Sequence, residues 1–165
     1  MKPLLKKDNL DPNIFKNYGP VSNIPFISKV LEKVAVKRLA DHLDINGLQE
    51  EYQSAYKLMH STETALLRVK HDIASSLDRN NAVLFVMLDL SAAFDTIDQD
   101  QLLCLLHEEY GITGKALSWF RTYLDDRTQR VQIETSTSDH VPLKCGVPQG
   151  SVLGPIIFTL YTTPT

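Results

Sequence analysis

The spacing of apolar residues in the first half of the chain predicts two helices. After Pro25, apolar side chains fall on one helical face (Ile27, Val30, Leu31 and Val34), and a proline suits the first turn of such a helix. Asn46-Gly47 then predicts a turn. A second helix is predicted after Ser61, with apolar residues at helical spacing (Leu66, Val69, Ile73 and Leu77), and Arg79-Asn80-Asn81 ends it. Residues 1–24 are polar and irregular in pattern.

The second half of the chain predicts three more helices. Asp98 is typical of an N-cap, with Gln101 as its capping-box partner, for a helix over 99–109 that Gly111 ends. Thr113 is expected to cap the next helix, whose apolar residues are Leu117, Trp119, Phe120 and Leu124. A last helix is predicted over 151–161, with its regular part after Pro155.

Two stretches of the chain predict strands. Seven apolar residues, 82–88, run directly into Asp89, a pattern typical of a buried strand that delivers a carboxylate to the rim of a sheet. Apolar and polar residues alternate around Val131–Ile133 and again around Val141–Leu143. A polar turn at 135–138 lies between them, so this region is predicted to form a β-hairpin. The order of elements indicates an α+β chain.

Bulk properties narrow the class without deciding the function. The chain has 165 residues, of which 43% are hydrophobic and 22% charged, which is an ordinary globular composition. The formal net charge is −3, so the strongly basic balance of many nucleic-acid-binding proteins is absent. The two cysteines, Cys104 and Cys145, have no metal-ligand spacing and are interpreted as free thiols. No signal peptide or transmembrane segment is recognised, which favours an intracellular location.

The carboxylate of Asp89 is the first candidate for chemistry. Transfer of a nucleotide needs divalent cations that hold the attacking and leaving oxygens, and Mg²⁺ prefers carboxylate ligands. A carboxylate at the end of a buried strand is suited to that role. Taken alone, however, Asp89 is better explained as a strand-end turn or a helix cap. Asp95 is ambiguous, and Asp98 is better explained as a cap.

The loop from Gly146 to Ser151 is the second candidate. Glycines allow a backbone to approach a ligand closely, proline limits the freedom of the loop, and the Gln149 amide can both donate and accept hydrogen bonds. Ordinary turns use the same residues, so the loop alone is weak support for a binding site.

Together, the segments 86–98 and 145–155 resemble reverse transcriptases of retrotransposons that lack long terminal repeats. Further similarity lies in Asn17–Pro25 with Lys29–Lys33, in Gln53–Lys57 with His60–Leu66, and in Leu117–Val131, so the resemblance covers nearly the whole chain. It implies a partial right-hand polymerase fold with fingers and an incomplete palm, in which palm strands pack against helices. The chain is then one partial domain, fingers-like over about 1–80 and palm-like over about 81–165.

The resemblance also implies roles for individual residues. Asp89 would be the catalytic metal ligand, and the backbone carbonyl of Leu90 would also touch metal. Phe94 would pack against the sugar of the incoming nucleotide and select deoxynucleotides, although a core phenylalanine is a strong competing interpretation. Gln149 and Gly150 would support the incoming nucleotide.

Lys57 would reach nucleic acid or a triphosphate, although a solvated surface lysine is at least as good an interpretation. Family members often have arginine where this chain has Gly19. They often have a basic residue and glycine where it has Leu58 and Met59. The complete enzyme would use Mg²⁺, or Mn²⁺, with an RNA template, a DNA primer and deoxynucleoside triphosphates as partners.

One part of the implied polymerase is not in the sequence. The family's aromatic-Ala-Asp-Asp segment is missing, because no Asp or Glu follows Asp139. We therefore expect the isolated chain neither to polymerise DNA nor to fold robustly. Primer extension that Asp89→Ala abolishes would contradict this. The alternatives are a non-catalytic module that binds RNA or protein and a reading frame without a function.

Overall fold

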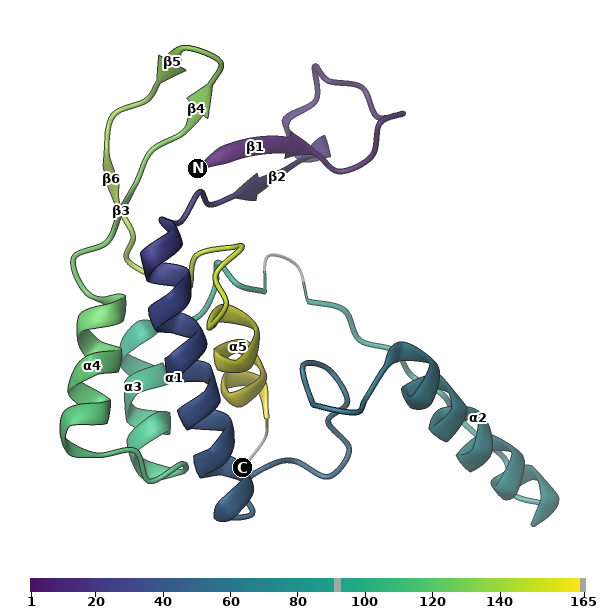
Figure 1. Cartoon of the computed structure of the whole chain (residues 1–165). Coiled ribbons are helices and arrows are strands. Elements are labelled where there is room, and N and C mark those ends of the chain that lie inside the picture. Colours follow the sequence, from purple (N-terminus) through teal and green to yellow (C-terminus); the bar gives the residue numbers. More distant parts are fainter. Residues whose placement is uncertain (91–92, 164–165) are drawn as a thin grey trace. The chain divides into compact units, whose positions relative to one another are not determined.

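The computed structural model describes residues 1–90 and 93–163 and divides the chain into two compact units. One unit comprises Met1–Leu48 with Ala92–Thr165, and the other comprises Gln49–Ser91. Figure 1 follows the chain through its helices and strands. The fold is α+β. The predicted division near residue 80 into fingers-like and palm-like parts stays a prediction.

The larger unit is built on four helices: α1 (Phe26–Ile45), α3 (Gln99–Glu108), α4 (Gly114–Leu124) and α5 (Gly154–Thr162). Their start and end points agree with the sequence signals to within a few residues. Helix α5 begins at Gly154, so Pro155 lies in its first turn rather than before its regular part, and Gly111 ends the α3 segment in the left-handed region (φ +63°), as predicted. Thr113 occupies the predicted N-cap position of α4, but its side chain makes no capping hydrogen bond. The local signals therefore located the helix starts, although not every predicted cap bond forms.

The core of the larger unit lies between these helices. Its fully buried members are Ile97, Leu102, Leu106, Leu124, Val147, Leu153 and Ile157. The apolar face predicted for α1 is different, because Ile27, Val30, Leu31 and Val34 are all exposed. The buried residues of α1 are instead Glu32, Leu39 and Leu43.

The N-cap of α3 is only partly as predicted. The Asp98 side chain accepts a hydrogen bond from the Gln101 N–H at 2.9 Å. The Gln101 side chain does not return to Asp98, because its Oε1 accepts from the Tyr161 hydroxyl at 2.8 Å. That hydroxyl in turn accepts from the Asp98 N–H at 3.4 Å. The capping box is thus replaced by a tyrosine from α5, a partner that local sequence cannot reveal.

The N-terminal region is more ordered than its sequence pattern predicts. Strands β1 (Lys2–Leu5) and β2 (Tyr18–Val21) pair antiparallel, and a 3₁₀ turn, η1 (Phe15–Asn17), precedes β2. Pro3 and Pro20 face each other across the ribbon. Both strands of a two-stranded ribbon are edges, where proline is tolerated.

The predicted β-hairpin is present, but its turn is earlier than expected. Strands β3 (Thr128–Gln129) and β6 (Val141–Pro142) pair at its base, and β4 (Gln132–Ile133) pairs with β5 (Ser136–Thr137) at its tip. The turn therefore consists of Glu134 and Thr135, with Glu134 at φ +52°, rather than residues 135–138. The polar residues predicted the region of the turn. They did not predict the hydrogen-bond register of the strands, which determines the turn residues.

The smaller unit contains helix α2 (Thr62–Asp78). Ser61 caps α2 in a capping box with Thr64, which confirms the predicted start. None of the described residues in α2 is buried. No described helix is long and apolar enough to cross a lipid bilayer.

The strand predicted over 82–88 is wrong. These residues have no regular secondary structure, and each of them is exposed. A strand needs a neighbour to satisfy its backbone N–H and C=O groups, and no strand in the described ranges pairs with this stretch. Apolar sequence alone therefore does not create a strand here.

Candidate functional site

The best-defined candidate site is a loop, residues 146–153, which we call the anchored loop. On its N-terminal side the Gly146 N–H donates to the Ile97 carbonyl at 2.6 Å, and the Val147 N–H donates to the Phe94 carbonyl at 2.8 Å. Gly146 has φ +80°, and a Cβ atom here would lie 2.7 Å from the Phe94 carbonyl oxygen. Only glycine fits this close crossing of two backbone segments.

A second segment holds the middle of the anchored loop. The Ser22 N–H, just before α1, donates to the Gln149 carbonyl at 3.0 Å, and the Ser151 N–H donates to the Pro148 carbonyl at 3.1 Å. Gly150 adopts φ +91°, which a side chain would strain. The glycines that attracted attention in the sequence are therefore required by the backbone conformation of the loop.

The Gln149 side chain is oriented by a neighbouring carboxylate. Its Nε2 donates a hydrogen bond to Asp95 Oδ2 at 3.0 Å. Since this bond uses an N–H of the amide, the amide oxygen remains available as an acceptor. The sequence left the role of Asp95 ambiguous, whereas the structure makes it the side chain that orients Gln149.

A pocket of about 320 Å³ adjoins these two side chains within the larger unit. Its lining includes Ser28, Asp95, Arg127, Arg130, Pro148 and Gln149. Arg127 is held in place because its guanidinium lies 4.2 Å from the centre of the Tyr123 ring and its Nε donates to the Tyr123 carbonyl. Two arginines, the Asp95 carboxylate and the Gln149 amide thus line one pocket. These residue types can hydrogen-bond a polar ligand such as a phosphate ester.

Phe94 lies beside the anchored loop and is half-buried. Its ring packs against Phe158 of α5, with ring centres 5.2 Å apart, and it contacts the core cluster. Its neighbour in sequence, Asp95, lines the pocket. The packing agrees with the core interpretation of Phe94 and leaves its role as a sugar-contacting residue a prediction.

Asp89 and Leu90 belong to the smaller unit, whereas the anchored loop belongs to the larger unit. Both are exposed, and the Asp89 carboxylate has no hydrogen-bond or ion-pair partner in the described part of the chain. Ser91 and Ala92 of the same motif lie outside the described residues. The exposure of Asp89 and Leu90 makes both residues accessible to a ligand but does not identify the ligand.

The residues present do not complete a metal site. Within residues 1–90 and 93–163, no three His, Cys, Asp or Glu side chains lie together in a way that could hold a metal ion. Asp89 offers one carboxylate, and Asp95 is already bonded to Gln149. One carboxylate with water ligands does not hold a pair of cations, whose mutual repulsion needs more negative charge.

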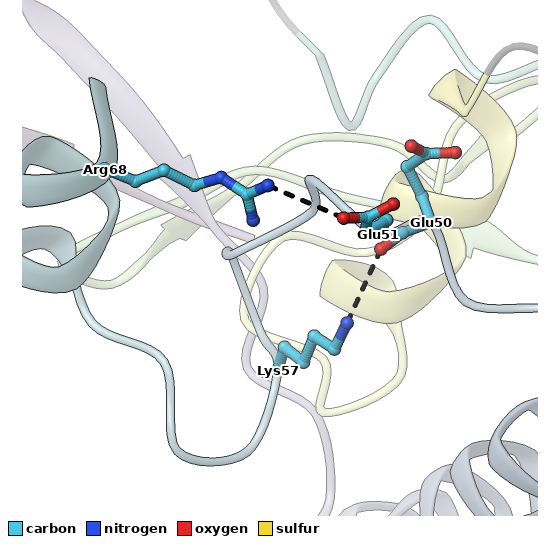
Figure 2. A network of polar contacts seen from close by, with 4 residues as sticks. All are labelled: Glu50, Glu51, Lys57 and Arg68. Carbon is cyan, nitrogen blue, oxygen red and sulfur yellow. Dashed lines mark hydrogen bonds and ion pairs between the residues drawn. The ribbon is translucent and has the colours of Figure 1, made fainter. Parts of the chain in front are cut away.

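Lys57 lies in a small polar network of the smaller unit (Figure 2). Its Nζ donates to the Glu50 carbonyl at 3.5 Å, and the residue is half-buried. Nearby, Arg68 pairs with Glu51 at 3.6 Å and stacks over the Tyr52 ring at 4.5 Å. The lysine therefore bonds within its own loop, and binding of nucleic acid by Lys57 stays a prediction.

Sequence reasoning missed one residue at the anchored loop, Glu32 of α1. Only 1% of its surface is exposed, and its Oε2 accepts from the Val152 N–H at 2.6 Å and the Leu153 N–H at 3.3 Å. The signal was present, because Glu32 shares a helical stripe with Leu39 and Leu43.

The hydroxyl of Tyr123 lies in the same buried region. No partner in the described part of the chain bonds to this oxygen or to Glu32 Oε1. Burial, and next the nearby Glu32 carboxylate, raises the pKa of Tyr123 to about 12. The interior next to the anchored loop thus contains a carboxylate and a phenol that stays protonated at neutral pH.

Comparison with known proteins gives a consistent family match. A sequence model described as "Reverse transcriptase (RNA-dependent DNA polymerase)" matches residues 4–165. The chain is 30% identical over 146 residues to a probable RNA-directed DNA polymerase from transposon X-element of Drosophila melanogaster, covering 88% of this chain and 16% of that protein.

Two other relatives carry similar names. The RNA-directed DNA polymerase from mobile element jockey of Drosophila melanogaster is 26% identical over 97% of this chain and 17% of its own length. A Pol polyprotein from type-1 retrotransposable element R2 of Popillia japonica is 23% identical over 86% of this chain and 19% of its own length. The chain thus spans less than a fifth of each of these three relatives.

Proposed function

Because the chain belongs to the reverse transcriptase (RNA-dependent DNA polymerase) family, we propose that it supplies part of the fingers and palm of a retrotransposon polymerase. In that enzyme a DNA primer would be extended on an RNA template. The primer 3′-hydroxyl would attack the α-phosphate of a deoxynucleoside triphosphate, and pyrophosphate would leave. The anchored loop, with Gln149 oriented by Asp95 beside a pocket that contains arginines, supports this proposal most directly.

In this proposal the anchored loop contacts the incoming nucleotide. Gln149 would use its free amide oxygen, and Gly150 would let the backbone approach the base or sugar without a side chain in the way. A loop held by hydrogen bonds on both sides loses little conformational freedom when the ligand binds, which favours affinity. Phe94 would contact the sugar and disfavour a 2′-hydroxyl. Lys57 would contact nucleic acid.

Asp89 would contribute one carboxylate ligand, and the Leu90 carbonyl a further oxygen, to a divalent cation of the Mg²⁺ or Mn²⁺ type. The cation would stabilise charge on the phosphates during transfer. Since the described residues do not complete such a site, Asp89 is proposed as a contributor and not as the whole centre.

The test is binding of a deoxynucleoside triphosphate, with Mg²⁺ present, to the 165-residue chain and to Gln149→Ala. We expect the variant to bind at least about fivefold more weakly, because one hydrogen bond to the ligand is lost. Gln132→Ala, at the exposed tip of the hairpin, is the matched control and should bind normally. Equal affinity of all three chains would contradict the proposal. RNA binding without nucleotide binding would favour the non-catalytic module instead.

Phe94 has its own test. Phe94→Ala should reduce the preference for a deoxynucleotide over the matching ribonucleotide. Phe158→Ala removes the same ring contact but leaves Phe94 in place, so it should keep the preference. Loss of the preference in both variants would assign the effect to packing and reject a role of Phe94 at the sugar.

A further inference from the structure

The exit of the anchored loop depends on a single buried side chain. Glu32 Oε2 accepts hydrogen bonds from two successive amides, at 2.6 Å from Val152 and 3.3 Å from Leu153. The next amide, that of Gly154, donates to the Ser151 hydroxyl at 2.9 Å. A carboxylate 120 residues away along the chain thus satisfies backbone groups that no α5 carbonyl can reach.

Burial of this carboxylate points to a specific role. A buried ionised group is strongly destabilising unless hydrogen bonds compensate it. Glu32 has two backbone donors on one oxygen, at 2.6 and 3.3 Å, but its Oε1 and the Tyr123 hydroxyl have no partner in the described ranges. An apolar side chain would fill this position without the cost of burying a carboxylate. The benefit of Glu32 therefore lies in the two amides, Val152 and Leu153, that its Oε2 binds.

The segment of residues 22–32 holds the anchored loop at two points. Ser22, just before α1, bonds to the Gln149 carbonyl, and Glu32, within α1, bonds to the amides that follow Ser151. Gln149 is thus held directly at the first anchor, and only Gly150 and Ser151 separate it from the second anchor at Val152. A shift of the loop exit would therefore displace the Gln149 amide from Asp95.

We infer that Glu32 is a positioning residue that fixes the anchored loop, and with it the Gln149 amide, through the backbone of Val152 and Leu153. Its importance for nucleotide binding rests on the proposed function. Its effect on the loop does not, because that effect exists without any ligand. Glu32 itself lies in the core and does not line the pocket.

The experiment measures amide hydrogen exchange and ¹⁵N NMR spectra of the 165-residue chain and three variants. In Glu32→Ala, exchange at Val152 and Leu153 should rise about tenfold or more, since a charge-assisted bond is lost. The Gln149 side-chain signals should also move. Glu32→Gln keeps an acceptor oxygen of nearly the same shape and should restore most of the protection. Asp41→Asn, on the exposed face of α1, is the matched control and should change neither.

Unchanged exchange at these amides in a folded Glu32→Ala chain would overturn the inference. So would a Glu32→Gln chain as perturbed as Glu32→Ala, because the acceptor would then not be the cause. If both variants fail to fold, the unsubstituted chain decides: slow exchange at Val152 supports the inference, and exchange at the rate of an open loop overturns it.

Nucleotide affinity separates this inference from the proposed function. Both hold if Glu32→Ala and Gln149→Ala weaken binding of a deoxynucleoside triphosphate while Glu32→Gln retains it. If Gln149→Ala binds normally while the exchange results are as expected, the proposed function fails and Glu32 still positions the loop. If Gln149→Ala weakens binding but Glu32→Ala binds normally with unchanged exchange, the proposed function stands and the inference about Glu32 fails.

Discussion

The anchored loop and the stretch of residues 82–90 belong to the two segments that carry the family resemblance, but they differ in how the structure holds them. Backbone contacts from Phe94, Ile97 and Ser22 and the carboxylate of Glu32 hold the anchored loop. The stretch 82–90 is exposed throughout and has no strand partner in the described part of the chain. A loop can be fixed by a few specific bonds to neighbouring segments, whereas an apolar strand depends on a sheet around it.

The largest expected effect concerns the crossing at Gly146. Gly146→Ala would place a Cβ 2.7 Å from the Phe94 carbonyl oxygen and force φ +80° on a residue with a side chain. We expect the free energy of unfolding to fall by about 3–5 kcal/mol, in the range of severe core changes. Denaturant unfolding measures it.

Gly111→Ala is the control for Gly146, because Gly111 also has positive φ but no atom within 4 Å of its Cβ position. Backbone strain alone should lower stability there by about 1–2 kcal/mol. Equal losses at the two glycines would show that the close contact does not matter.

The next largest effect is a difference in stability when a leucine is truncated in the anchored loop or in the stretch 82–90. Leu153, at the end of the anchored loop, is 0% exposed, whereas Leu84 is 90% exposed. Leu153→Ala is expected to lower the free energy of unfolding by about 3 kcal/mol, and Leu84→Ala to change it by less than about 0.5 kcal/mol. A large loss for Leu84→Ala would mean that residues 82–88 are buried in solution, as the sequence predicts.

High pH should weaken the side of the core that holds the anchored loop. The pKa of Tyr123 is raised to about 12 in the folded chain, against about 10 when unfolded. Between these values the unfolded chain releases the proton and the folded chain keeps it, so stability falls as the pH rises. The loss should be about 2 kcal/mol from this group and absent in Tyr123→Phe. Parallel pH curves for the two chains would contradict it.

A smaller gain in stability is expected in the unit of residues 49–91. Met59 has φ +62° and is 90% exposed, so its side chain adds backbone strain without packing. Met59→Gly, the residue that the resemblance implies here, should raise the stability of this unit by about 0.5–1 kcal/mol. Met59→Ala keeps the strain and should not. Local exchange rates in the capped helix α2 measure both.

Local signals predicted the helices, and long-range contacts explain the misses. Ser61, Asp98 and Pro155 mark helix starts correctly because capping depends on neighbours in sequence. The β1–β2 ribbon and the Tyr161 bridge to Asp98 depend on partners far along the chain.

In the candidate site, too, the local signals were predictable and the long-range contacts were not. Sequence motifs located Gln149 and Gly150, but not the contacts that hold them. The role of Asp95 was ambiguous until the structure showed its bond to Gln149, and Glu32 was not singled out because its partners, the amides of Val152 and Leu153, lie far along the chain. Asp89 belongs to the other unit, and its role as a metal ligand stays a prediction.

The central claim is that the anchored loop is a preformed contact surface for a deoxynucleotide. Titration of the ¹⁵N-labelled chain with a deoxynucleoside triphosphate and Mg²⁺, followed by NMR, tests it most directly. We predict saturable shifts of the Gln149 side-chain and Gly150 backbone signals, with the hairpin tip at Glu134 and Thr135 unchanged. The absence of saturable shifts at Gln149 and Gly150 would contradict the claim, as would shifts of equal size at the hairpin tip.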